Sequence, residues 1–194
     1  MTAWRPRANL EHLRRRAALV DRTRAFFAGS GVLEVDTPVL QGGANLDHGV
    51  SPLRVDTSAG PRFLPTSPEH PLKRLVAAGC GPVWALAPAF RADEHGRRHR
   101  SEFRMLEWYR PGWDDVRLRE EVLAYVADLS GLGEDHETLT WREAYRRYAL
   151  LDPIEASDGD LRRALGADAA AATDRAAALD LLMVTRIEPN LGQG

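Results

Sequence analysis

The chain has 194 residues, of which 44% are hydrophobic and 28% charged, so it is long and apolar enough to bury the core of one globular domain. Its formal net charge of −2 gives no general attraction to nucleic acid or anionic membranes. The single cysteine, Cys80, excludes an internal disulfide and a cysteine metal cage, and neither a secretory signal nor a membrane-spanning apolar run is present. We therefore expect one cytoplasmic domain, with or without an insertion, and no membrane segment.

The first predicted element is a helix that begins at Asn9, a favourable N-cap residue. Its apolar residues recur at helical spacing on one face: Leu10, Leu13, Ala17, Val20 and Phe27. Gly29 and Gly31 end the helix, and a short strand follows from residue 31 to residue 35. Pro38 then stops the strand, because proline cannot donate to a sheet.

Residues 41–61 are rich in Gly, Asn, Asp, Ser and Pro, and they predict a loop around a short strand near residues 53–55. The Ser-Pro-Glu run at 67–69 is typical of a helix start, with an N-cap, a proline in the first turn and an acid that the dipole favours. Pro71 fits less well and leaves the exact start open. The glycines at 79 and 81 end this helix.

Two strands joined by an arginine-rich loop are the most informative feature of the chain. The first strand runs from Val83 to Arg91, and the loop carries arginines 97, 98 and 100 together with His99. Because side chains alternate along a strand, one face of the second strand presents four residues in a row. These residues are Phe103, Met105, Glu107 and Tyr109.

This hairpin offers groups for binding a nucleoside triphosphate and a cationic small molecule. Arginine forks bind phosphate, Phe103 is suited to stacking on a base, and Glu107 with Tyr109 is suited to holding an ammonium group. Small residues on the Arg91 face of the first strand either leave room for a ligand or pack under a helix. The alternative for the whole hairpin is a half-solvated sheet with a solvated loop.

The remaining residues predict helices. One runs from Val116 to Leu129 and another from Trp141 to Leu150. The alanine-rich stretch from Ala164 to Leu182 predicts a solvent-side helical insertion, covering about residues 150–185, rather than a site.

Three segments in chain order resemble class II aminoacyl-tRNA synthetases in their lysine-specific form. The run FRADEHGRRHRSEFRMLEWYRP is similar to motif 2, which covers about residues 83–111 with its first strand. GVLEVDTPVL resembles motif 1, at about residues 9–40 with its helix, and TSPEHPLKRLVAAGCGPVWALAPAFR resembles the segment leading into motif 2. AYRRYALLDP and IEPNLGQG echo later parts of the family. The EF-x-M-LEWYRP run is most similar to the elongation factor P (R)-β-lysine ligases, short paralogues within this family.

The resemblance implies an α+β fold, a class II synthetase-like antiparallel β-sheet flanked by helices, incomplete because the motif 3 strands and helix are missing. It implies a homodimer joined through motif 1. The implied activity is ATP-dependent activation of (R)-β-lysine or lysine as an adenylate, followed by transfer to a lysine of elongation factor P. The family uses Mg²⁺ with ATP.

The resemblance also implies roles for individual residues. Arg91 matches the catalytic arginine that bridges the substrate carboxylate and the α-phosphate. The implied ATP-binding residues are Arg91, Ala92, Asp93, His99, Arg100 and Phe103. Two of them depart from the family, since Asp93 stands where glutamate is usual and Arg100 where asparagine is typical. The His95–His99 pair is a weak metal candidate, because no acid lies near it in helical phase.

On the amino-acid side, Ser67, Pro68 and Glu69 match the segment that contacts the substrate amine. Glu107 and Tyr109 match residues near the side-chain ammonium, which needs a carboxylate partner when it is buried. For Glu69 the alternative is an acid at a helix N-terminus without any ligand.

In the family, motif 3 and the acidic Mg²⁺ ligands follow the point where the resemblance stops. We therefore expect Mg²⁺ ligands outside these residues, impaired activity of a truncated chain, and no metal site within it. The short segment before motif 1 leaves no room for an anticodon-binding domain, which makes tRNA binding unfavoured. Two alternatives stay open: a lysyl-tRNA-synthetase-like ligase acting on tRNA, and a non-catalytic binding or regulatory paralogue.

Overall fold

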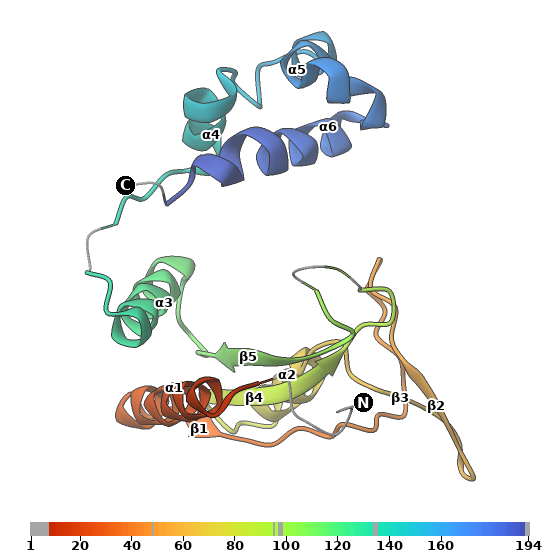
Figure 1. The fold of residues 1–194 in the computed structure, drawn as a ribbon, viewed down its shortest axis with the longest axis vertical. Helices are drawn as coiled ribbons and strands as arrows, with labels where there is room; N and C mark the ends of the chain where they lie inside the picture. Colours follow the sequence, from red (N-terminus) through yellow and green to blue (C-terminus); the bar gives the residue numbers. More distant parts are fainter. Residues whose placement is uncertain (1–7, 48, 95, 97–98, 134–135, 193–194) are drawn as a thin grey trace. The chain divides into compact units, whose positions relative to one another are not determined.

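A computed structural model of the chain describes residues 8–47, 49–94, 96, 99–133 and 136–192. They form two compact units, Met1–Glu134 and Asp135–Gly194, each with its own internal contacts (Figure 1). The sequence predicts one catalytic domain that contains both units, and that assignment stays a prediction.

The centre of the first unit is a three-stranded sheet of order β1–β4–β5 (Figure 1). Strands β4 (Val83–Phe90) and β5 (Glu102–Tyr109) pair antiparallel, which confirms the predicted hairpin. The short strand β1 (Leu33–Glu34) pairs parallel with β4, so the sheet is mixed rather than purely antiparallel. The predicted α+β sheet flanked by helices is otherwise confirmed.

The register of the hairpin decides which side chains share a face. Phe103 lies opposite Ala89, Glu107 opposite Ala85, and Tyr109 opposite Val83. Directly opposed residues point to the same side of an antiparallel pair. The predicted row on β5 therefore shares its face with the small residues of β4.

Helices α1 (Leu10–Gly29) and α3 (Asp115–Ser130) contribute to the core on the other face of the sheet. The Asn9 side chain accepts a hydrogen bond from the His12 backbone N–H at 2.8 Å, as expected for an N-cap. This core consists of aromatic and aliphatic side chains: Phe26, Phe27, Val32, Trp84, Leu86, Leu106, Trp108 and Tyr125. This core fixes the orientation of β5, because it packs around Leu106 and Trp108, which alternate along the strand with the candidate-site residues.

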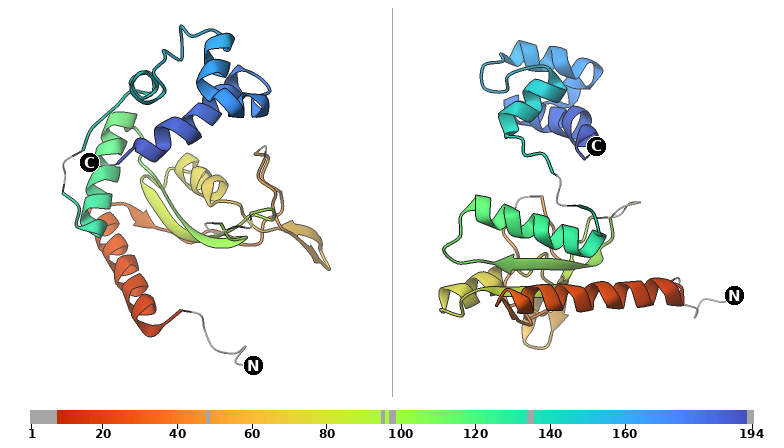
Figure 2. Two further views of the ribbon diagram at one scale, coloured as in Figure 1. Left: turned by 45° about the horizontal axis from the view of Figure 1, so that its top comes forward. Right: turned by 90° about the vertical axis from the view of Figure 1, so that its left-hand side faces the viewer.

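Only the C-terminal part of the predicted apolar face of α1 is buried. Phe27 is fully buried, whereas Leu10 and Leu13 are 60% and 50% exposed. Figure 2 shows that the N-terminal half of α1 projects past the sheet, which explains the exposure.

Helix α2 (Glu69–Ala77) packs on the candidate-site face. Leu72 lies in one buried cluster with Ala85 and Ala87, so this part of the alanine-lined strand packs under a helix. Pro71 lies in the first turn of α2, where its missing N–H has no helical partner to lose.

A second hairpin, β2 (Arg54–Thr57) with β3 (Gly60–Phe63), lies in the region predicted as a loop around one short strand. The strand near residues 53–55 is found, but its partner was missed. Gly60 has a φ of 102°, a conformation that favours glycine at the turn between the strands.

The second unit is helical. Its elements are α4 (Trp141–Ala144), a π-helix (Tyr145–Ala149), α5 (Asp158–Leu165), a 3-10 helix (Gly166–Ala171), α6 (Arg175–Leu182), a π-helix (Met183–Ile187) and a 3-10 helix (Glu188–Asn190). One core joins them, built from Ala144, Tyr145, Leu161, Leu165, Ala172, Ala178, Leu182 and Ile187.

The alanine-rich stretch is therefore not a solvent-side helix, and that interpretation is wrong. Leu165, Ala178 and Leu182 are buried in the core of the second unit, because the stretch is broken into separate helices that fold onto one another. Its status as an insertion stays a prediction. Across the described part of the chain, no helix is both long and apolar enough to cross a membrane.

Candidate nucleotide and amino-acid site

Arg91 follows the end of β4, and four contacts fix its place. Its backbone N–H donates to the Ser101 carbonyl at 2.9 Å, which continues the strand pairing into the loop end of the hairpin. Its Nε donates to the Thr66 carbonyl at 3.3 Å, and its guanidinium pairs with Glu94 at 2.9 Å. Its guanidinium carbon also lies 5.3 Å from the centre of the Phe103 ring. The side chain is thus held over the site face rather than extended into solvent.

The segment before α2 is tied to the same strand end. The Phe90 N–H donates to the Pro65 carbonyl at 2.8 Å, next to the Arg91–Thr66 contact. Ser67 accepts a hydrogen bond from the Glu69 N–H at 3.4 Å, which sets the start of α2. These bonds bring the Ser67–Glu69 segment beside Arg91 without any direct bond between their side chains.

Glu107 and Tyr109 form a second group further along β5. The Tyr109 hydroxyl donates to Glu107 Oε1 at 2.7 Å. Burial raises the pKa of Glu107 above its usual value, whereas the Tyr109 hydrogen bond and the Lys73 charge oppose this rise. Burial, the hydrogen bond to Glu107 and the charge of that carboxylate raise the pKa of Tyr109, which keeps the phenol protonated as a donor.

Glu69 faces this second group from α2. It forms an ion pair with Lys73, one helical turn later. Its charge also contributes to the raised pKa of Glu107, so the two carboxylates are near enough to repel each other. Glu107 and Tyr109 are hydrogen-bonded to each other, and the charge of Glu69 reaches both, a set of groups suited to ammonium ligands.

The predicted loop residues are less tightly placed. Asp93, His99 and Arg100 are exposed, and the Ala92 backbone N–H donates to the Ser51 carbonyl at 2.9 Å. His95 and residues 97–98 lie outside the described part of the chain. The structure therefore brings Arg91, Phe103 and the start of α2 together, and Glu69, Glu107 and Tyr109 together, but does not connect the loop residues to either group.

Among the residues that the structure describes, no group of three or more His, Cys, Asp or Glu side chains is arranged to hold a metal ion. The acids of this region are either engaged with arginine or lysine, as Glu94 and Glu69 are, or hydrogen-bonded, as Glu107 is. These residues alone do not fit a Mg²⁺ site.

Sequence reasoning missed three contributors to the site. Thr66 acts through its backbone carbonyl, which no side-chain pattern reveals. Glu94 pairs with Arg91 three residues earlier, and this spacing was a signal that could have found it. Lys73 stands four residues after Glu69, the spacing of a helical ion pair.

Comparison with known families decides the assignment. The profile of the tRNA synthetases class II (D, K and N) matches residues 1–172. The chain belongs to this family. The predicted class II synthetase-like ligase fold is therefore confirmed at the level of the family.

Among class II relatives, the chain is 40% identical, over an alignment 205 positions long, to the elongation factor P–(R)-β-lysine ligase of Enterobacter sp. (strain 638). The same identity is found with the ligase of Salmonella paratyphi A (strain ATCC 9150 / SARB42). In both cases the match covers 98% of this chain and 62% of the relative, so the chain spans less than two thirds of their length.

A solved class II structure is also similar to the chain. It is the asparaginyl-tRNA synthetase from Pyrococcus horikoshii complexed with asparaginyl-adenylate, at 27% identity and a TM-score of 0.53. The match covers 62% of this chain and 28% of that protein. The similarity supports the α+β class II architecture of the part it covers.

Proposed function

We propose that this chain serves the ATP-dependent activation of (R)-β-lysine, or lysine, as an adenylate, and its transfer to a lysine of elongation factor P. In the first step a substrate carboxylate oxygen attacks the α-phosphorus of ATP, and pyrophosphate leaves. No protein nucleophile is required, so the residues must align the reactants and offset the charge that develops on phosphate oxygens.

The placement of Arg91 carries the proposal. Its guanidinium lies beside the Phe103 ring and is held by the Thr66 carbonyl at the entrance to α2. A planar fork at this junction can bind a carboxylate and a phosphate oxygen at once, with fixed angles as well as charge. Phe103 offers a ring for the adenine next to that fork. Glu94 already pairs with Arg91, so ligand oxygens compete with one carboxylate for the guanidinium.

The second group supplies the amino-acid end. Glu107 and Tyr109 lie four and six positions beyond Phe103 on the same face of β5. At about 3.3 Å per residue, Phe103 and Glu107 are about 13 Å apart along the strand. Adenine at one end and a side-chain ammonium at the other would place the reacting carboxylate between them. Asp93, His99 and Arg100 then line the triphosphate side in this proposal, with Ala92 in the connecting backbone.

The binding partners follow from the same assignment. We propose elongation factor P as the acceptor, a homodimer formed through α1 and β1, and no role for tRNA. Mg²⁺ would accompany ATP, but the described residues do not hold it by themselves. Among the candidate-site residues, Arg91 would therefore neutralise the phosphate charge.

Calorimetry with ATP and with L-lysine tests the proposal on the 194-residue protein. We expect binding of both ligands, and a loss of ATP affinity of at least about tenfold in Arg91→Ala, because a charge-assisted contact to phosphate is removed. Arg104→Ala is the matched control, since Arg104 lies on the other face of β5 and donates to the Leu86 carbonyl. Equal effects of the two variants would contradict the proposed site.

Two further measurements separate the alternatives. Pyrophosphate exchange into ATP with (R)-β-lysine detects the activation step, and binding of both ligands with little exchange is the result expected of a truncated ligase. A folded chain that binds neither ATP nor lysine favours the non-catalytic paralogue. Aminoacylation of lysine tRNA, in place of elongation factor P, would identify a lysyl-tRNA-synthetase-like ligase.

A further inference from the structure

Lys73 is the one lysine in the 194-residue sequence. It lies on α2, and its ammonium pairs with the Glu69 carboxylate one turn earlier. On a free helix surface such a pair would contribute little and have no wider role. Its surroundings show that it is more than a surface pair.

Carboxylates from three different segments act on the Lys73 ammonium. The hydrogen bond and charge of Glu69 raise its pKa most, and the charges of Glu107 on β5 and Asp47 before β2 raise it further, against partial desolvation. The Lys73 side chain is itself exposed, and its ion pair is with Glu69 on the same helix.

Glu69 and Glu107 are also the carboxylates assigned to the substrate's amines in the proposed function. Glu69 is thus paired with an ammonium on a lysine side chain, the chemical group that the substrate would bring. We infer that Lys73 is an internal competitor: its ammonium occupies Glu69 while the amino-acid site is empty, and the amine of the substrate displaces it. The inference rests on the proposed function and goes beyond it, because it assigns a specificity-determining role to a residue outside the substrate-binding set.

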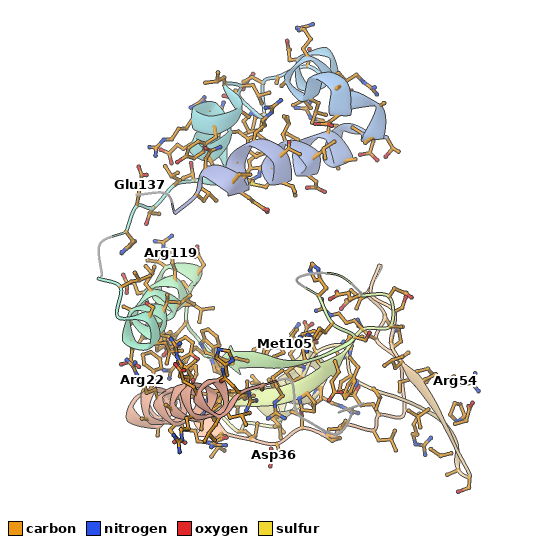
Figure 3. The ribbon with its side chains drawn as sticks, in the orientation of Figure 1. Arg22, Asp36, Arg54, Met105, Arg119 and Glu137 are labelled. Atoms are coloured by element: carbon orange, nitrogen blue, oxygen red, sulfur yellow. The ribbon has the colours of Figure 1, made fainter. Side chains whose placement is uncertain are left out.

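The displaced side chain has room to move. Lys73 lines a cavity of about 970 Å³ between α2 and the segment after β1. His70 and Arg74 line it from the helix, and Asp36, labelled in Figure 3, is the acid in its lining. A rotated Lys73 side chain would therefore have space in this cavity once it leaves Glu69.

This arrangement sets a threshold for binding. Any amine that takes Glu69 must first break the Lys73 pair, so an amine without further contacts binds weakly. A diamino acid gains a second ammonium contact at Glu107 and can overcome the same cost. The competitor thereby keeps singly charged amines and small cations out of the site.

Because Lys73 is the one lysine, its ammonium can be followed without interference. Protein labelled with [ε-¹³C]lysine gives one side-chain ¹³C–¹H signal, and the signal of Glu69→Gln defines the unpaired Lys73. We expect saturating unlabelled L-lysine to move the wild-type signal toward that unpaired position. Norleucine, which lacks the side-chain amine, should do so only at much higher concentration.

The affinity of Lys73 variants for L-lysine also tests whether Lys73 competes with the substrate for Glu69. Lys73→Met should bind L-lysine about two- to fivefold more tightly, the range expected for loss of one exposed ion pair. Lys73→Arg should remain near wild type, and Arg74→Met on the same helix controls for net charge. In a Glu69→Gln background, Lys73→Met should give no gain, because the contested carboxylate is gone.

The outcomes separate this inference from the proposed function. L-lysine binding with an unmoved Lys73 signal overturns the inference and leaves the proposed function standing. Weaker binding by Lys73→Met that Lys73→Arg restores would make Lys73 a support for Glu69, which also overturns it. If calorimetry detects binding of neither L-lysine nor (R)-β-lysine to the wild type, the proposed function fails and the inference fails with it.

Discussion

The Tyr109 hydroxyl donates to the Glu107 carboxylate at 2.7 Å, from two positions further along the same face of β5. Burial of Glu107 favours its protonated form, and the hydrogen bond from Tyr109 favours the ionised form. The pair therefore keeps a partly buried carboxylate available for a cation. Period-two alternation makes this contact possible, since residues two apart on a strand share a face.

Tyr109→Phe should make ligand binding more sensitive to acid. Ammonium binding needs an ionised Glu107, so affinity is present above the folded-state pKa of Glu107 and is lost as the pH falls through it. Without the phenol, that raised pKa rises further, and the loss of L-lysine affinity should begin at a higher pH than in the wild type. Calorimetry across the acidic range measures the shift.

Tyr125→Phe is the control for this experiment. Tyr125 shares a hydrogen bond with Thr23 at 2.9 Å, and it packs on the opposite face of the sheet. It loses a comparable hydroxyl without touching Glu107. A pH profile of Tyr109→Phe that coincides with both wild type and Tyr125→Phe would refute the role assigned to the pair.

A buried ion pair holds the end of β5 to α3. The side chains of Arg110 and Glu121 are only 5% and 7% exposed. Glu121 Oε2 also accepts from the Trp108 indole at 2.9 Å, and Arg110 donates to the Ser30 carbonyl at 3.0 Å. Three segments of the first unit, the end of β5, α3 and the turn after α1, therefore meet at one carboxylate and one guanidinium.

Glu121→Leu should destabilise the protein by about 3–5 kcal/mol, because the Arg110 guanidinium would stay buried without its counter-ion. Urea unfolding followed by tryptophan fluorescence measures the change. Glu120→Leu, at an exposed position of the same helix, should change stability by no more than about 0.5 kcal/mol. Similar changes in the free energy of unfolding for both variants would show that the Arg110–Glu121 pair does not stabilise the fold.

The hairpin could be predicted because its signal is local. Alternation fixed the shared face of Phe103, Glu107 and Tyr109, and parity on β4 extended that face to Arg91. The β2–β3 hairpin was predicted only in half, since Gly60 and Pro61 at the start of β3 are residues more typical of loops. The parallel pairing of β1 was missed because it depends on a contact fifty residues away along the chain, between Leu33 and Val83.

The sequence predicted those parts of the candidate site that consist of side chains, and it did not predict the backbone groups that contact them. Arg91 and Phe103 are close together as the resemblance implies, but the bond from Arg91 to the Thr66 carbonyl has no trace in the pattern of side chains. In the alanine-rich stretch, composition suggested solvent exposure, whereas Leu165 and Leu182 supply the core. Low complexity does not by itself decide burial when a few leucines recur at helical spacing.

The second unit has its own core, and a cavity there should act locally. Leu161 is fully buried between the helices of that unit. Leu161→Ala should cost about 2–5 kcal/mol of stability in this unit. Hydrogen exchange should therefore speed up for the amides of α5 and α6 while those of β4 keep their protection.

Leu191→Ala, at a half-exposed position of the same unit, is the control and should leave exchange in α5 and α6 unchanged. Faster exchange in β4 caused by Leu161→Ala would show that the two units unfold together, in agreement with one cooperative domain.

The exposed half of α1 gives the last prediction. Leu10 and Leu13 lie on the helix where it projects past the sheet, and Leu33 on the edge strand β1 is 57% exposed. Large apolar side chains that stay exposed on a projecting helix indicate an interface between copies of the chain. Sedimentation velocity should therefore show concentration-dependent dimers of the wild type. Leu13→Asp should weaken them by more than about tenfold, because it places an unpaired charge in a desolvated contact.

Leu46→Asp is the matched control, since Leu46 is 91% exposed on the segment before β2, away from α1. Dissociation by Leu46→Asp rather than Leu13→Asp would place the interface elsewhere, and a wild type that stays monomeric at every concentration would exclude the α1 dimer altogether.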